Sequence, residues 1–119
     1  GFIFLDCVFT ADKRPEGSKI WVGRSQGTGS EKSPDRWDSI ALINCTLDEN
    51  YESELWTDEN GTKLVFPQKG SKETGWREFG TMRKLKDGSV VEDSITGRNQ
   101  HGYIMTLQEA EELRKEFAV

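Results

Sequence analysis

The chain has 119 residues, a formal net charge of −5 and a mean hydropathy of −0.72, and 34% of its residues are hydrophobic. This length suits one domain with one modest core. Because the sequence has no basic patch and no apolar run near the roughly 20 residues of a membrane span, we expect neither a nucleic-acid partner nor a membrane partner.

The chain begins with an apolar stretch that has no polar lead-in. Residues 2–9 (FIFLDCVF) alternate in the manner of a half-buried strand. A strand pattern that starts at the first residue is typical of an internal segment, so we interpret the chain as a piece of a longer protein.

A short motif in this first strand recurs 38 residues later. Residues 4–9 (FLDCVF) and 42–47 (LINCTL) both place two apolar residues before Asp or Asn and then Cys, and residues 19–24 form another strand-like run between them. Stacked coils would produce this pattern, with the Cys inside and the Asp or Asn at a turn. Two unrelated strands would produce it equally well.

Cysteine and histidine counts limit the chemistry that the chain can perform. Cys7 and Cys45 are too few for a disulfide scaffold, and with His101 as the single His we expect no metal site and no cofactor. If the coils stack, we expect both cysteines to be free buried thiols, with a disulfide as the alternative.

The polar segment that follows the third strand-like run is a loop by composition. Residues 23–38 (GRSQGTGSEKSPDRWD) contain spaced glycines, but neither Lys-Ser nor Lys-Thr follows the last of them, so we exclude a phosphate-binding loop. Trp37 could stack on a sugar ring or cap the core, and we favour the cap.

The second half contains weaker signals and then a clear helix. Asp58-Glu59-Asn60-Gly61 predicts a hairpin turn, and we expect Trp56 and Trp76 to be buried rather than to form a sugar platform. We interpret Glu78 as part of an ordinary surface charge set. Thr106 and Glu109 form a capping box that starts a C-terminal helix.

Several segments, taken in order, resemble the pectinesterases. They are residues 2–9, 21–25 (WVGRS), 41–47 (ALINCTL), 75–80 (GWREFG) and 103–110 (YIMTLQEA). The resemblance implies an all-β fold, a partial right-handed parallel β-helix of the pectin-lyase type, with a C-terminal α-helix. On this basis we expect a single domain over residues 1–119, with stacked coils over 1–50 that carry the loop 23–38, an irregular extension over 51–104 and a helix over 105–118.

The resemblance also implies a function. Pectinesterases hydrolyse the methyl ester of galacturonate units in pectin without a metal, and they act outside the cell or in the periplasm. Arg24 matches the Arg that holds the nucleophilic carboxylate, so we expect it to be catalytic, and we expect Gln26, Trp21 and Trp37 to bind substrate. No segment here matches the family's two catalytic Asp residues, so we expect the chain alone to be inactive. Ser25-Gln26 replaces the family's Pro-Trp, which leaves the substrate open.

Other readings remain open. The chain could be a non-catalytic carbohydrate-binding or structural module, or part of a pectate-lyase-like enzyme with a calcium-binding set of carboxylates. Asp6 could be a catalytic carboxylate, but we favour a turn residue. The expected partner is pectin or a related acidic polysaccharide, and we also expect that the N-terminal coil could support self-association.

Overall fold

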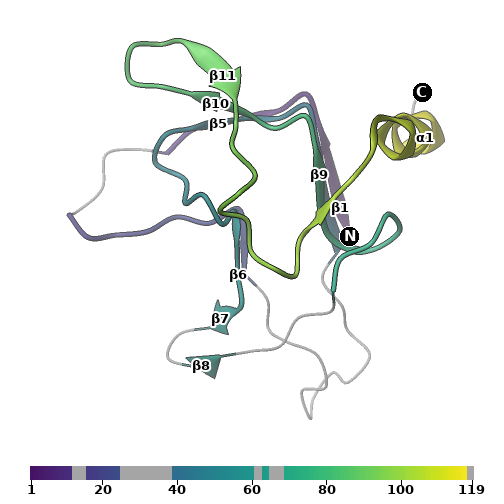
Figure 1. Cartoon of the computed structure of the whole chain (residues 1–119), viewed down its shortest axis with the longest axis horizontal. Coiled ribbons are helices and arrows are strands. Elements are labelled where there is room, and N and C mark those ends of the chain that lie inside the picture. The colour runs from purple at the N-terminus through teal and green to yellow at the C-terminus, as the bar shows by residue number, and fades with distance from the viewer. Residues whose placement is uncertain (12–15, 25–38, 61–62, 65–68, 118–119) are drawn as a thin grey trace.

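The computed structural model describes residues 1–11, 16–24, 39–60, 63–64 and 69–117 (Figure 1). The elements in chain order are β1 (Phe2–Leu5), β2 (Val8–Phe9), β3 (Gly23–Arg24), β4 (Ser39–Ile43), β5 (Thr46–Asp48), β6 (Trp56–Thr57), β7 (Glu59–Asn60), β8 (Lys63–Leu64), β9 (Gly75–Phe79), β10 (Met82–Lys84), β11 (Val90–Glu92), β12 (Tyr103–Ile104) and α1 (Leu107–Phe117). Gln26 and Trp37, which are predicted to bind substrate, lie outside the described residues.

The strands form two four-stranded sheets and two pairs. The first sheet has the order β1-β4-β9-β12 and is parallel throughout. The second has the order β11-β10-β5-β2 and is mixed, because β11 runs antiparallel to β10 while the other pairs are parallel. The two larger sheets meet at a sharp bend (Figure 1), and β3 pairs in parallel with β6.

The expectation of an all-β, right-handed parallel β-helix is wrong. The structure is a small α/β-type arrangement with parallel and mixed sheets and one C-terminal helix. The β10–β11 and β7–β8 pairs are antiparallel, and α1 covers one face of the first sheet. The two repeats predict parallel pairing between their own strands, but they say nothing about the antiparallel pairs or about what covers the sheet.

The two copies of the short motif pair with each other in register. Phe4 is opposite Leu42 in the first sheet, and Val8 is opposite Thr46 in the second. The bend between the sheets falls at Asp6 and Asn44, whose φ angles are 55° and 53°. Asn and Asp adopt this left-handed conformation more readily than most residues. The shared Asp or Asn of the motif is therefore the corner residue.

A third corner follows the same geometry without the motif. Gly80 lies between β9 and β10 with φ 67°. The backbone N–H of Asn44 donates to the Phe79 carbonyl, as that of Asp6 donates to the Ile43 carbonyl, both at 2.9 Å. These bonds continue the parallel ladder through each corner. We call each pair of strands joined by such a corner a layer. The short motif does not mark this third layer, because Gly80 stands where the motif has Asp or Asn and Thr81 stands where it has Cys.

Two hydrophobic clusters lie on opposite faces of the first sheet. One cluster lies between the sheets and contains Leu42, Cys45, Leu47, Leu55, Trp56 and Trp76. The other lies under α1 and contains Ala41, Ile43, Met105, Ala110 and Leu113. Because β4 is covered on both faces, its sequence SIALI is continuously apolar rather than alternating.

The prediction that both tryptophans are buried is confirmed, and so is the prediction of free thiols, but Cys7 is only partly buried. The rings of Trp56 and Trp76 stack with centroids 5.6 Å apart, and both residues are at most 1% exposed. Cys7 and Cys45 are free, and Cys45 is buried, where desolvation raises the pKa of its thiol. Neither indole ring of this pair is available as a sugar platform.

The capping box at the start of α1 is also confirmed. The backbone N–H of Glu109 donates to the Thr106 hydroxyl at 3.2 Å, and that of Thr106 donates to the Glu109 carboxylate at 2.9 Å. Only some of the apolar residues of α1 are buried. Ala110 and Leu113 face the sheet, whereas Leu107 and Phe117 are more than half exposed.

Candidate functional site

Arg24 lies at the surface, on the β3–β6 pair opposite Thr57. Trp21 precedes this strand and is half-buried, and its indole Nε1 is buried without a hydrogen-bond partner in the described part of the chain. Two of the four predicted site residues, Trp21 and Arg24, are therefore described by the structure, and both belong to the segment that leads into β3.

Arg24 differs from the other arginines that the structure describes. Arg83 and Arg98 form buried ion pairs, Arg114 forms an exposed one, and Arg77 is buried. Within residues 1–11, 16–24, 39–60, 63–64 and 69–117, Arg24 forms no ion pair. Arg24 is thus an exposed residue whose side chain has no carboxylate partner among the described residues.

Asp6 is a corner residue, as favoured from the sequence. Arg114 of α1 donates to both of its carboxylate oxygens, at 2.8 and 3.0 Å. These hydrogen bonds lower the pKa of Asp6. A carboxylate that is already held by a bidentate guanidinium is poorly placed to attack an ester.

A buried set of four charged side chains fills the space beside the third corner. Glu78 of β9 accepts two hydrogen bonds from Arg98, at 2.8 and 3.0 Å, and a third from the Thr81 hydroxyl at 2.8 Å. Asp93 accepts from both Arg98 and Arg83, each at 2.8 Å at the shortest. The four side chains are 3–11% exposed.

The interpretation of Glu78 as a surface charge is wrong, because the residue is 2% exposed. The strand pattern could not reveal this, since the main partner of Glu78 is Arg98, which lies 20 residues further along in a segment without regular structure. The one available signal was the alignment of layers, in which Glu78 is opposite Leu42 and Arg83 is opposite Leu47. Charged residues at positions that are apolar one layer earlier indicate a buried ionic cluster.

We expect acid to destabilise the protein through Asp93. Although burial raises the pKa of Asp93, the hydrogen bonds from Arg83 and Arg98 outweigh it and hold the pKa below the ordinary value of 3.8. A lowered folded-state pKa stabilises the fold above the unfolded-state pKa, and this contribution is lost as the pH falls through the folded-state value. The free energy of unfolding, measured by urea titration from neutral pH down to about pH 2, should therefore fall below about pH 4. The Asp93→Asn variant should show a flatter profile, and an equally steep one would contradict this assignment.

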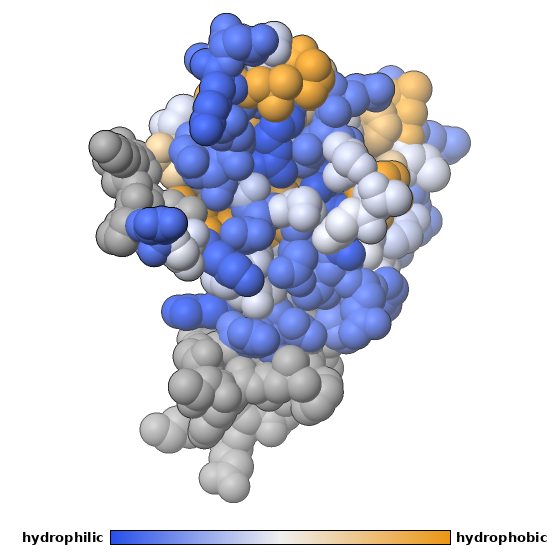
Figure 2. Space-filling view, turned by 60° about the vertical axis from the view of Figure 1, so that its left-hand side comes forward, coloured by the Kyte–Doolittle hydropathy of each residue, from blue (hydrophilic) through white to orange (hydrophobic). Residues whose placement is uncertain are grey.

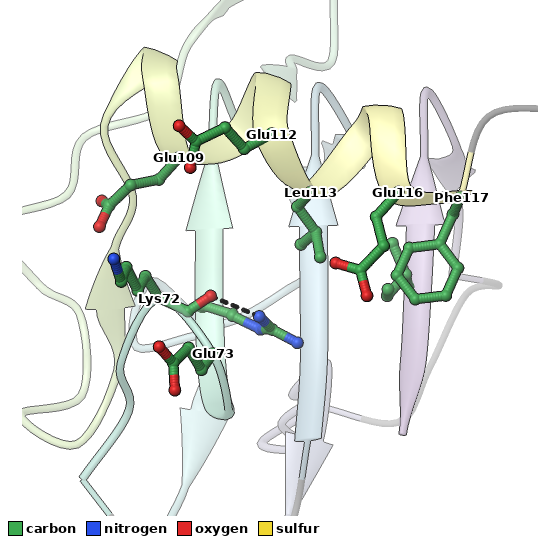
Figure 3. Close-up of a pocket in the computed structure, with 9 residues that line it drawn as sticks. Lys72, Glu73, Glu109, Glu112, Leu113, Glu116 and Phe117 are labelled. Atoms are coloured by element: carbon green, nitrogen blue, oxygen red, sulfur yellow. Dashed lines mark hydrogen bonds between the residues drawn. The ribbon is translucent and has the colours of Figure 1, made fainter.

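A groove of about 410 Å³ is lined by residues of α1, of the first sheet and of the loop before β9. In Figure 3 the helix crosses β9, β4 and β1, and the labelled side chains of Lys72 and Glu73 face it from the loop before β9. The lining residues are Ile3, Lys72, Glu73, Arg77, Glu109, Glu112, Leu113, Glu116 and Phe117. Sequence reasoning missed this groove because its two walls are more than 30 residues apart along the chain.

The face of the molecule drawn in Figure 2 is mainly hydrophilic. Figure 2 shows one face on which hydrophobic areas are small and separate. In the described part of the chain, no group of three or more His, Cys, Asp or Glu residues could hold a metal ion. No helix among the described residues is long and apolar enough to cross a membrane.

Comparison with known proteins places the chain in no family. No family model, no curated protein and no solved structure matches this sequence or its structure.

Proposed function

We propose that the chain is the C-terminal part of a pectinesterase-like carbohydrate esterase and that Arg24 contacts carboxylates of a galacturonate-containing polysaccharide. The observation that carries this proposal is the state of Arg24, which is exposed and forms no ion pair among the described residues. A guanidinium presents paired N–H donors that match the two oxygens of a carboxylate. The ordered motifs around Arg24 supply the link to this substrate class.

Within an esterase, Arg24 would hold a carboxylate ionised and oriented for attack on the ester carbonyl. A neighbouring cation favours the charged form of a carboxylate, and only that form is a nucleophile. No described segment matches the two catalytic Asp residues of the family, and Asp6, the carboxylate weighed for that role, is held by Arg114. The state of Asp6 favours a second candidate, a non-catalytic module that binds the same polysaccharide.

Binding to polygalacturonate, measured by affinity electrophoresis and calorimetry, tests the proposal. We expect Arg24→Ala to weaken binding roughly tenfold, because a charge-assisted hydrogen bond contributes about 1.5–3 kcal/mol. Arg24→Lys should recover only part of the loss, because lysine keeps the positive charge but lacks the paired N–H donors of a guanidinium. Lys86→Ala is the matched control, since Lys86 is also an exposed cation, with a side chain 88% exposed. Equal binding by the Arg24 and Lys86 variants would refute the role of Arg24.

Methanol release from methyl-esterified pectin separates the two candidates. We expect none from the 119-residue chain, because no segment of it matches the family's two catalytic Asp residues. Release by a longer chain that includes these residues, abolished by Arg24→Ala, would support the esterase. Polysaccharide binding without release in that longer chain would favour the module.

A further inference from the structure

The floor of the groove under α1 contains a buried cation whose hydrogen bonding is incomplete. Arg77 of β9 is 5% exposed. Its Nη1 donates to the Lys72 carbonyl at 2.6 Å (Figure 3), its Nη2 makes a long 3.5 Å contact with the Ser39 hydroxyl, and its Nε has no partner in the described part of the chain. A guanidinium has five N–H donors, so most of its capacity is unused.

This cation also has no counter-ion at close range. Among the described residues, no carboxylate lies within 4.0 Å of the Arg77 guanidinium. Burial lowers the pKa of Arg77, and the charge of Glu116 only partly offsets this effect. A buried charge without a partner is costly, and the cost falls when an anion enters the site. The floor is therefore suited to a carboxylate.

Apart from the exposed Lys72, the rim of the groove offers carboxylate acceptors rather than further donors. Glu73, Glu112 and Glu116 are exposed and line the groove, and Figure 3 shows all three side chains around it. The Glu109 carboxylate is already occupied by the Tyr103 hydroxyl and the Thr106 N–H. The Glu112 carboxylate accepts a hydrogen bond from the Gln108 amide at 3.1 Å, whereas the Glu73 and Glu116 carboxylates accept none from the described residues. Carboxylates at a rim can accept hydrogen bonds from ligand hydroxyls.

An apolar wall completes the groove. Ile3, Leu113 and Phe117 line it, and the Phe117 ring is about half exposed, at 52%. An exposed aromatic ring provides a flat surface for the apolar face of a sugar. The groove volume of about 410 Å³ falls within the usual range of small-molecule sites, about 300–1,000 Å³.

We propose that this groove binds a uronic acid, with Arg77 holding the carboxylate, the rim glutamates accepting from the sugar hydroxyls and Phe117 covering one face of the ring. The choice of a uronic acid among hydroxylated carboxylates rests on the proposed function, whereas the groove itself is separate from Arg24. The exposed rim charges are screened by solvent, so the buried cation dominates at the short distance at which the carboxylate binds.

Titration of the chain with D-galacturonate and with D-galactose, followed by calorimetry and by amide NMR shifts, tests this proposal. We expect millimolar binding of galacturonate, shifts concentrated in the residues that line the groove, and binding of galactose at least roughly tenfold weaker, because it lacks the carboxylate. Equal binding of the two sugars, no binding at millimolar galacturonate, or tighter binding of a zwitterionic amino acid such as alanine would overturn the proposal.

Variants then locate the site. We expect Arg77→Gln to weaken galacturonate binding roughly tenfold or more, and Phe117→Ala to weaken it roughly threefold. Phe117 is exposed, so its variant remains informative if Arg77→Gln fails to fold. Glu111→Gln is the control, because Glu111 is exposed on α1 and does not line the groove.

The two proposals can fail separately. If Arg24→Ala abolishes galacturonate binding and Phe117→Ala leaves it unchanged, the groove is not the binding site. The proposed function would then still stand. The opposite result is that galacturonate binds in the groove while Arg24→Ala leaves the affinity for polygalacturonate unchanged. This result would support the groove as a uronic acid site and refute the role of Arg24.

Discussion

Replacing Arg98 with Met is expected to lower the free energy of unfolding by about 3–5 kcal/mol. Arg98 donates to Glu78 and Asp93, and both acidic side chains are at most 11% exposed. Its loss leaves Glu78 as a buried carboxylate with only the Thr81 hydroxyl as a side-chain donor. Urea denaturation followed by tryptophan fluorescence measures the change. A loss no larger than that of Arg114→Met, whose ion pair with Asp6 is exposed, would contradict the assigned role.

The double variant Glu78→Leu with Arg98→Met tests the physical reason for this loss. Leu42 occupies the position opposite Glu78 in the preceding layer, so the site can accommodate a leucine in register. The Arg83–Asp93 ion pair stays in place. We expect the double variant to recover most of the stability, since removal of both members of a buried ion pair is often neutral or stabilising. Failure to recover would indicate that the ion pair itself, rather than the orphaned charge, supports the fold.

The second large effect is expected for Gly75→Ala, at the start of β9. Gly75 has φ 80°, and a Cβ there would lie 2.7 Å from the Gly70 Cα. The left-handed conformation costs an alanine about 1–2 kcal/mol, and the backbone clash adds a further cost of about 1–3 kcal/mol. We therefore expect the free energy of unfolding to fall by about 2–5 kcal/mol in total, as measured by chemical denaturation.

Gly88→Ala is the matched control for Gly75→Ala. Gly88 has a similar φ of 88°, but nothing lies within 4 Å of an added Cβ. This variant should show only the conformational cost, about 1–2 kcal/mol. Equal losses for the two variants would mean that the close approach of Gly75 to Gly70 has no energetic importance.

Local patterns predicted the parts of this fold that depend on neighbours in sequence. The capping box at Thr106 and Glu109 was visible because its two residues are three positions apart. The corners at Asp6 and Asn44 were visible because both carry the same motif. The turn at Asp87 and Gly88, before β11, is also present, and Asp87 accepts from the Ser89 N–H at 2.9 Å.

Contacts between distant segments could not be predicted in the same way. The ionic cluster requires Arg98 to return beside β9, and no periodicity encodes that return. The burial of Arg77 could not be predicted, for a related reason. Arg77 belongs to a strand whose two faces are both covered, so a charged side chain there has no alternating pattern to mark it. The all-β interpretation failed because the pattern indicates which strands pair, but not that a helix covers their outer face.

The three corners bear on how the chain tolerates changes in length. Asp6, Asn44 and Gly80 hold equivalent places in successive layers, yet the interval from Asn44 to Gly80 is two residues shorter than that from Asp6 to Asn44. Hydrogen bonds at each corner set the register there and reset it at the next. Insertions and deletions in the connecting segments are thus absorbed between corners without displacing the strands that follow.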